Sequence, residues 1–316
     1  GHHLVNRLIQ TEEVVYVVDD LSSSVVDVEK CWLTVKSRTI LPQMLPHYNL
    51  KDDSRKPKIV FINSDFANYN VVDFIEKSNI NTVYHLAAKP RVEWSVENPI
   101  ESTHENFTKV LTLAKACASS STRLVFSSTA AVYGNVEELP TKESSPKNPL
   151  SPYGLAKLCT EKYLGLFEKL YGLDWAALRY FNVYGPAQPG NSPYSTVVSA
   201  WCHKVCVKEP LRSDGDGEQT RDMVYVDDVV SANICVAKAE KLNNRVFNVG
   251  SSSAVSNNYI RARFVDKGYT DVEHAPERKG DVRHTLADTT LIRHIGWRPM
   301  VEFDIGLEKV FKYWEL

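Results

Sequence analysis

The chain has 316 residues, and its 37 lysines and arginines against 39 aspartates and glutamates give a formal net charge of −2. A charge so close to zero excludes a broad basic surface for nucleic acid, while a local basic pocket for an anion stays open. The sequence has no apolar stretch of about 18–20 residues that could cross a bilayer, and it does not open with a signal peptide, so we expect no membrane partner.

The six cysteines are scattered and lack the spacing of a disulfide framework, which predicts a reducing, cytoplasmic environment. Cys202, His203 and Cys206 are metal-type ligands at short spacing, but no second pair accompanies them. Because Cys202 and Cys206 lie in a predicted helix, we interpret them as core cysteines and predict no metal site.

Short apolar runs alternate with helical patterns through the first 180 residues. The predicted strands are 14–18, 58–62, 82–86, 123–126 and 175–180, and the predicted helices are 70–78, 101–118 and 153–171. Nearly unbroken apolar strands are typical of a parallel sheet that is buried on both faces. This rhythm predicts an α/β fold with a doubly wound parallel sheet.

The rhythm loosens after residue 180, where prolines become frequent. Helical patterns recur at 195–207, 227–240 and 301–314, and a strand is predicted at 246–249. We therefore predict a dinucleotide-binding domain over 1–180 and a smaller mixed α/β substrate domain over 181–316, with the chain possibly crossing between them. The polar stretch 33–57 is interpreted as a loop or insertion.

The sequence begins with a helical pattern over residues 2–9 that no strand precedes. A doubly wound dinucleotide fold begins with a strand and a Gly-rich turn before its first helix, whereas this sequence begins within that helix. Gly1 resembles the last glycine of such a turn, and we expect the preceding part to exist in the molecule.

Tyr153 and Lys157 are the strongest chemical signal. Residues four apart lie on one helical face, so both side chains can point into one site. A free phenol titrates near pH ~10, and a neighbouring cation favours the phenolate. The pair can therefore supply a tyrosine base near neutral pH. Upstream, the strand at 123–126 runs into Ser127, Ser128 and Thr129, at the strand end where doubly wound sheets bind ligands.

These motifs occur in the order found in the extended short-chain dehydrogenase/reductase family, and they span nearly the whole chain. The sequence resembles the nucleotide-sugar epimerase/dehydratase branch, most of all its UDP-glucose and UDP-N-acetylglucosamine 4-epimerases. The matching segments are 17–22, 85–88, 127–134, Tyr153 with Lys157, 178–185, 215–222 and 280–283.

The resemblance implies NAD as the cofactor. Asp19, at the end of the second strand of such a fold, suits the ribose diol and selects NAD over NADP. Asp65 is expected near the adenine, and Tyr180 near the nicotinamide. The full expected cofactor set is Gly1, Asp19, Asp20, Leu21, Asp65, Leu86, Ala87, Ala88, Asn106, Ser127, Tyr153, Lys157, Tyr180 and Val183.

The resemblance also implies a nucleotide-sugar substrate held by the C-terminal half. Arg221 and Arg278 are expected on the diphosphate, since guanidinium groups bind phosphate oxygens in pairs. Thr285 stands where some galactose epimerases carry a bulky tyrosine, which leaves room for an N-acetyl group at C2 of the sugar. The expected substrate contacts are Ser128, Thr129, Asn182, Arg221, Arg278, Asp281 and Thr285.

In this branch, Tyr153 would take the proton of the sugar 4-hydroxyl, with Lys157 and Thr129 as the other catalytic residues. Dehydratases of the branch have an Asp-Glu pair after the active-site threonine, but Ala130 and Ala131 occupy those positions here. The resemblance therefore implies 4-epimerisation of a UDP-hexose. A UDP-glucuronate 4-epimerase, another dehydratase or decarboxylase of the branch, and an NAD-binding regulatory pseudoenzyme remain alternatives.

A homodimer is also implied. The predicted helices 101–118 and 153–171 resemble the pair that forms a four-helix bundle between subunits of this family. We expect Ala114, Ala116, Leu158 and Leu164 to supply small and apolar surface for that contact, although they could instead face the sheet.

Overall fold

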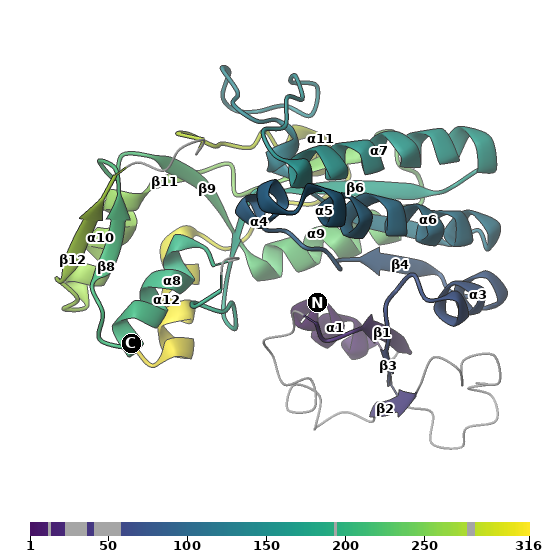
Figure 1. Cartoon of the computed structure of the whole chain (residues 1–316), viewed down its shortest axis with the longest axis horizontal. Helices are drawn as coiled ribbons and strands as arrows, with labels where there is room; N and C mark the ends of the chain where they lie inside the picture. Colours follow the sequence, from purple (N-terminus) through teal and green to yellow (C-terminus); the bar gives the residue numbers. More distant parts are fainter. Residues whose placement is uncertain (12–13, 23–36, 41–57, 193–194, 277–281) are drawn as a thin grey trace.

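A computed structural model describes residues 1–11, 14–22, 37–40, 58–192, 195–276 and 282–316 (Figure 1). The predicted α/β class is confirmed: parallel strands form layers that helices cover. No helix in the described part of the chain is long and apolar enough to cross a membrane.

The N-terminal strands form a three-stranded parallel sheet in the order β1-β3-β2. Strand β1 is Val15–Asp19, β2 is Ser37–Ile40 and β3 is Ile59–Asn63. The interpretation of 33–57 as a loop is wrong for residues 37–40, because their backbone pairs in parallel with β3. The polar side chains concealed this edge strand, since only four residues contribute to the ladder. The rest of 33–57 lies outside the described residues.

A second parallel sheet has the order β10-β6-β5-β4. Its strands are β4 (Thr82–His85), β5 (Arg123–Thr129), β6 (Trp175–Tyr180) and β10 (Val246–Val249). The central residues of β5 and β6 are fully buried, as the apolar runs predicted. Strand β10 comes from the C-terminal half and pairs with β6, so the chain returns to this sheet. The domain division at residue 180 stays a prediction.

In the described residues the ladder is interrupted between β1 and β4, each of which lies at one end of its sheet. Side-chain packing joins them. Helix α1 (His2–Leu8) places Leu4 and Leu8 against Val230, and side chains from β1 and β4 complete this cluster. A larger core extends from β3 to β5 and β6 beneath α3 (Tyr69–Lys77), α6 (Lys109–Ser119) and α7 (Pro152–Tyr171). Side-chain packing therefore connects the two N-terminal sheets despite the break in the ladder.

Helices cover both faces of the second sheet, with α9 on the opposite side from α5, α6 and α7 (Figure 1). The helices around the two parallel sheets are, in chain order, α1, η1 (Ile9–Thr11), α3, α4 (Val92–Glu97), α5 (Pro99–Thr103), α6, α7 and α9 (Val226–Lys238). Helix α7 begins where Ser151 accepts a hydrogen bond from the Gly154 amide, and it ends at Gly172, which adopts a left-handed conformation.

The predicted helix over 101–118 is divided into α5, a π-helical segment η4 (His104–Thr108) and α6. Asn106 lies in this segment and is buried. Its amide donates to the Ser102 carbonyl and to the Lys89 carbonyl, so the wider turn lets a polar side chain bond outside the helix.

The C-terminal region holds two small sheets beside the N-terminal layers (Figure 1). Strands β7 (Asn182–Tyr184), β9 (Thr220–Tyr225) and β11 (Ala254–Ser256) form one, and β8 (Leu211–Asp214) and β12 (Val272–Ala275) form the other. The remaining helices are η5 (Ala130–Val132), α8 (Val197–Cys206), α10 (Asn257–Asp266), α11 (Thr290–His294) and α12 (Phe303–Trp314).

The four residues expected at a subunit contact face inward instead. Ala114, Ala116 and Leu164 are fully buried within the subunit, and Leu158 is nearly so. Their small and apolar side chains fill the space between the helices and the sheet, which is why they were mistaken for contact residues. Any contact between subunits must use other residues.

Candidate active site

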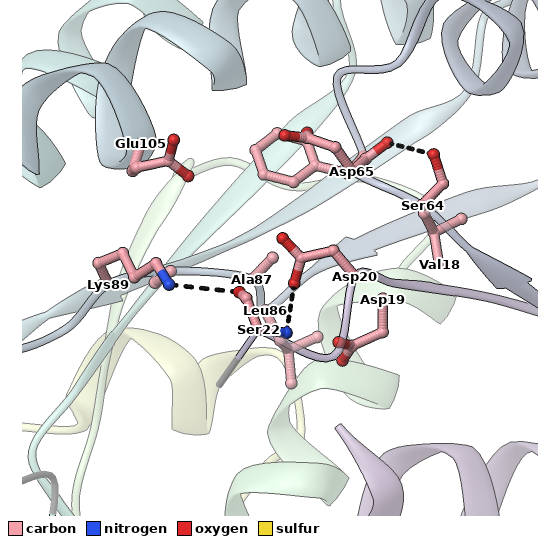
Figure 2. A pocket seen from close by; sticks show the side chains of 12 residues that line it. Val18, Asp19, Asp20, Ser22, Ser64, Asp65, Leu86, Ala87, Lys89 and Glu105 are labelled. Atoms are coloured by element: carbon pink, nitrogen blue, oxygen red, sulfur yellow. Dashed lines mark hydrogen bonds between the residues drawn. The ribbon is translucent and has the colours of Figure 1, made fainter. Parts of the chain in front are cut away.

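A pocket opens at the carboxyl ends of β1, β3 and β4 (Figure 2). Loops that follow parallel strands meet at this edge, which is where open α/β sheets bind ligands. Its volume is about 200 Å³. Pockets that hold whole ligands span about 300–1,000 Å³, so this one suits one nucleoside half of a dinucleotide. Its lining is Val18, Asp19, Asp20, Ser22, Ser64, Asp65, Phe66, Leu86, Ala87, Ala88, Lys89 and Glu105.

Two exposed carboxylates lie at the pocket rim: Asp19 is the last residue of β1, and Asp20 follows it. Asp19 accepts a hydrogen bond from the Leu21 amide at 2.7 Å, and Asp20 accepts one from the Ser22 amide at 2.9 Å. Partial burial raises the pKa of Asp20, but the Ser22 hydrogen bonds and the charges of Lys89 and Lys109 bring it below its ordinary value. Both acids can thus accept hydrogen bonds from a ribose diol.

Asp65 is held by a salt bridge at the opposite side of the pocket. The Lys109 ammonium lies 2.6 Å from Asp65 and 2.5 Å from Glu105, so one cation serves two acids. The Ala67 amide also donates to Asp65 at 2.8 Å. This pairing fixes the side chain of Asp65 and leaves Asp19 and Asp20 as the acids at the other rim.

The loop after β4 is anchored from behind. The Asn106 side chain accepts from the Lys89 amide at 3.0 Å and donates to the Lys89 carbonyl at 3.1 Å. The Lys89 ammonium extends across the pocket to the Ser22 hydroxyl, 3.2 Å away (Figure 2). Asn106 therefore positions the loop without lining the pocket.

Six of the expected cofactor residues line this pocket together: Asp19, Asp20, Asp65, Leu86, Ala87 and Ala88. Gly1 caps helix α1, and Leu21 packs beside Val5 and Phe61, so neither is among the lining residues. Six lining residues were not expected from the sequence: Val18, Ser22, Ser64, Phe66, Lys89 and Glu105. Ser64 and Lys89 lie two and three residues after predicted strands, which was the signal that could have found them.

The second group of expected residues gathers at the ends of β5 and β6. Tyr153 and Lys157 lie on the buried face of α7, with 8% and 1% of their surface exposed. Burial raises the pKa of Tyr153 to about 12, and a hydrogen bond with Thr129 opposes that rise. Thr129 ends β5 and also accepts a hydrogen bond from the Ala131 amide at 3.1 Å.

Lys157 lies beneath the tyrosine. Its ammonium donates to the Ser127 carbonyl at 2.9 Å and lies 4.6 Å from the centre of the Phe126 ring and 6.0 Å from that of Tyr153. Burial lowers the pKa of Lys157 to about 7, against the charge of Glu161, which raises it. The structure thus brings the Lys157 ammonium to the ring of Tyr153 on the inner face of α7.

Tyr180 completes this group from the end of β6. Its hydroxyl lies 3.1 Å from the Ser127 hydroxyl and 3.0 Å from the Asn233 amide oxygen. The Ser128 side chain is buried and donates to Glu161 at 2.5 Å. The structure thus brings Ser127, Thr129, Tyr153, Lys157 and Tyr180 together.

The expected substrate contacts of the C-terminal half lie on and beside β7 and β9. The Thr285 hydroxyl accepts from the Asp222 amide at 3.1 Å and donates to the Asn182 side chain at 3.5 Å. Arg221 precedes Asp222 on β9 and donates to the Arg283 carbonyl at 3.1 Å. Val183 pairs with β9 on the same strand as Asn182.

Asp222 is a residue that sequence reasoning missed. It is fully buried, and its carboxylate accepts from the amides of Ser251, Ser252 and Ala287. These bonds tie the loop after β10 to the segment that carries Thr285. A buried acid within the matched motif 215–222 was the signal available. Arg278 and Asp281 lie outside the described residues.

The two cysteines of α8 differ in burial. Cys202 is buried, as expected, whereas Cys206 is exposed, so its interpretation as a core residue is wrong. Cys206 is the last residue of α8 and does not belong to the hydrophobic cluster that contains Cys202. Within the described ranges, no group of three or more metal-type ligands comes together.

A parallel sheet with acids at its strand ends, beside a buried Tyr–Lys pair, defines a dinucleotide-dependent enzyme of the short-chain dehydrogenase/reductase type. The chain belongs to the NAD dependent epimerase/dehydratase family, whose model matches residues 1–250. NAD, predicted from the sequence, is confirmed as the family's cofactor.

Several of the similar proteins are named as 4-epimerases. The chain is 30% identical, over 99% of its length and 94% of the relative, to a putative UDP-glucose 4-epimerase of Methanocaldococcus jannaschii. It superposes with a TM-score of 0.86 on the UDP-N-acetylglucosamine 4-epimerase of Methanobrevibacter ruminantium M1, solved with UDP-N-acetylmuramic acid, at 31% identity with 100% and 94% of the chains covered. The UDP-glucose 4-epimerase of Thermotoga maritima, solved with UDP-glucose, gives 0.83 at 32% identity with 100% and 95% covered.

Proposed function

We propose that this chain, an NAD-dependent nucleotide-sugar 4-epimerase, interconverts UDP-glucose and UDP-galactose and also accepts their N-acetylated forms. The observation that carries the proposal is the buried pair Tyr153 and Lys157 beside the half-buried Thr129, which Ala130 and Ala131 follow directly in the chain. The names of the relatives, UDP-glucose and UDP-N-acetylglucosamine 4-epimerases, support the same two substrate classes.

The residues present suit NAD. The exposed carboxylates of Asp19 and Asp20 offer acceptors to a ribose diol, while a 2′-phosphate would meet two negative charges. Leu86, Ala87 and Ala88 give the pocket an apolar side for a base. NAD supplies the hydride acceptor at C4 of the sugar when it is bound. Tyr180 and Lys157, at the ends of β6 and α7, are proposed to contact its nicotinamide half.

Tyr153 is the proposed acid–base group. In the protein alone, burial keeps the phenol protonated, with a pKa of about 12. The Lys157 ammonium favours the phenolate, which can then take the proton of the sugar 4-hydroxyl at its Oη atom. The same phenol returns the proton after the resulting 4-keto sugar has rotated in the site to present its other face. Thr129 orients the hydroxyl between them through one hydrogen bond.

The residues after Thr129 distinguish epimerisation from dehydration. Elimination of water across C5 and C6 requires a second acid and base beside the sugar. Ala130 and Ala131 form the short helix η5 there and cannot transfer a proton. With no acid or base at these two positions, we propose that the 4-keto sugar is reduced from its other face, which completes the epimerisation.

The C-terminal half is proposed to hold the nucleotide. Arg221, and by sequence Arg278, would bind the diphosphate, and Asp281 the nucleoside. Asn182 and Thr285, joined by their hydrogen bond, would face the sugar. Because Thr285 is small, an N-acetyl group at C2 of the sugar has room beside it.

A homodimer is proposed through α7, one of the two helices expected at the contact, but through other side chains than the four expected. An apolar stripe runs along α7 through Leu155, Tyr163, Leu166 and Leu170, each at least 41% exposed, beside Ile100 of α5 at 86%. Spacings of three, four and eight residues place the four α7 side chains on one helical face. An exposed apolar stripe of this size is typical of a protein interface, and a second copy of the chain is the proposed partner.

The test is a coupled assay of the purified chain with UDP-glucose, UDP-galactose, UDP-N-acetylglucosamine and UDP-glucuronate. We expect interconversion of the first pair and turnover of the third. Activity on UDP-glucuronate alone would identify the UDP-glucuronate 4-epimerase, and binding of NAD without any turnover would identify a pseudoenzyme. A stable 4-keto-6-deoxy product would contradict the argument from Ala130 and Ala131.

A further inference from the structure

A buried carboxylate lies one helical turn beyond the proposed catalytic lysine. Glu161 follows Lys157 by four residues on the inner face of α7, and 5% of its surface is exposed. It accepts a hydrogen bond from the Ser128 hydroxyl at 2.5 Å and from Arg179 at 2.9 Å and 2.6 Å. Each oxygen of the carboxylate therefore has a donor.

Arg179 of β6 is equally enclosed. Its guanidinium is bound in the paired geometry to Glu161 and also donates to the Tyr133 hydroxyl at 2.8 Å and to the Glu143 carbonyl at 3.2 Å. Burial of an ion pair contributes little to stability, because desolvation of both charges offsets their attraction. A fully satisfied pair beside a proposed active site therefore calls for another explanation.

The pair touches the site through two routes. Ser128 lies between Ser127, whose carbonyl holds Lys157, and Thr129, which bonds Tyr153. A fixed Ser128 therefore fixes the strand end that carries both contacts. The second route is the charge itself, since Glu161 lies on the same helical face as Lys157.

We propose that Glu161 is a positioning residue for 4-epimerisation, which holds the end of β5 in register with α7 and keeps Lys157 in its cationic form. This rests on the catalytic roles proposed above for Tyr153 and Lys157. Arg179 neutralises and orients the carboxylate, so that the negative charge stays buried without a partner on the substrate.

The charges around Lys157 agree with this assignment. Burial lowers the pKa of Lys157, and Glu161 is the neighbour whose charge raises it. His85, at the end of β4, is neutral, because burial and the charge of Lys157 lower its pKa to about 3. The other titratable groups facing Lys157 or the ion pair are Tyr153 of α7, Arg179 and Tyr180 of β6, and Tyr133, Glu143 and Lys147 of the loop after β5.

Glu161→Gln keeps the size of the side chain and removes its charge. Lys157 then faces the Arg179 cation without compensation, so it loses its proton at lower pH, and the phenolate of Tyr153 loses its partner. We expect kcat for UDP-glucose to fall at least about tenfold and the alkaline limb of its pH profile to move about one pH unit lower. The KM should change by less than about threefold, since Glu161 does not reach the nucleotide.

The chain offers a matched control on the same helix. Glu168 pairs with Arg245 at 2.9 Å and 2.7 Å and accepts from the Trp175 indole at 2.9 Å, two turns farther from the site. Glu168→Gln should lower the melting temperature without moving the pH profile. If Glu161→Gln moves the profile no more than Glu168→Gln does, the proposal is overturned.

Two further variants separate the two routes and keep the test open if Glu161→Gln does not fold. Ser128→Ala leaves the charge in place, so kcat should fall with the alkaline limb unmoved; full kcat would overturn the positioning of β5. Glu161→Asp keeps the charge and should restore the limb to its position in the unmodified enzyme.

Tyr153→Phe is measured alongside: if it stays active, the proposed function fails, whichever way the Glu161 variants behave.

Discussion

Replacing Lys157 by methionine should make the cofactor-free protein more stable at pH 6 and less stable at pH 10.5. Burial lowers the pKa of this lysine from its ordinary 10.5 to about 7. A lowered pKa means that the unfolded chain binds the proton more tightly than the folded chain does. Lys157 therefore lowers the free energy of unfolding most below pH 7, where both states are protonated. This destabilisation shrinks as the pH rises from 7 to 10.5 and vanishes above 10.5, where both states are neutral.

The magnitude follows from the same two values. At about 1.4 kcal/mol per pH unit, the fall from 10.5 to about 7 corresponds to about 5 kcal/mol. The methionine also leaves the Ser127 carbonyl without its donor, which costs about 1–3 kcal/mol at every pH. The variant should therefore gain on the order of 2–4 kcal/mol at pH 6 and lose about 1–3 kcal/mol at pH 10.5.

Urea unfolding of the protein freed of cofactor, at pH 6.0, 8.0 and 10.5, measures this difference. Lys162→Met is the control, because Lys162 lies on the same helix and is exposed; its effect should be small and independent of pH. A difference between Lys157→Met and the unmodified chain that is the same at all three pH values would refute the reasoning.

Three other predictions address the substrate and the assembly. Thr129→Val should lower kcat by about tenfold or less, because one orienting hydrogen bond of about 0.5–1.5 kcal/mol is lost; a loss as large as that of Tyr153→Phe would argue for a larger role. Thr285→Tyr should reduce kcat/KM for UDP-N-acetylglucosamine more than for UDP-glucose, with Thr285→Val as the control for the lost hydroxyl; equal losses on both sugars would count against the pocket assignment. Leu170→Glu should shift the mass measured by light scattering from dimer toward monomer, whereas a monomeric unmodified chain would remove the basis for the interface.

Much of the N-terminal fold could be predicted because its strands are buried on both faces. The run Trp175–Tyr180 is apolar at almost every position, and β6 coincides with the predicted strand. The predicted helix 153–171 matches α7, Pro152–Tyr171, within one residue, and Ser151 and Gly172 cap it in the structure. Strand β2 escaped prediction, since Ser37–Ile40 is short, polar at three of its four positions and paired on one edge.

Only some residues of the candidate site could be predicted from the sequence. Tyr153 and Lys157 could be found because helical spacing alone places them together. Asp222 could be noticed only as a member of the matched motif 215–222, because its bonds to the loop of Ser251 arise from the fold. Glu161 could not be found, because its importance arises from Arg179, which lies on another element. The division of residues 101–118 by η4 was hidden for the same reason, since Asn106 departs from the helix pattern to bond the backbone of Lys89.

The central claim is that Tyr153 exchanges the proton of the sugar 4-hydroxyl in a 4-epimerase. The most direct measurement is kcat for conversion of UDP-galactose to UDP-glucose by the unmodified chain and by Tyr153→Phe, with NAD binding measured on both. The account predicts a loss of about 10²–10⁴-fold in kcat with NAD affinity nearly unchanged. Near-normal turnover by Tyr153→Phe would contradict it.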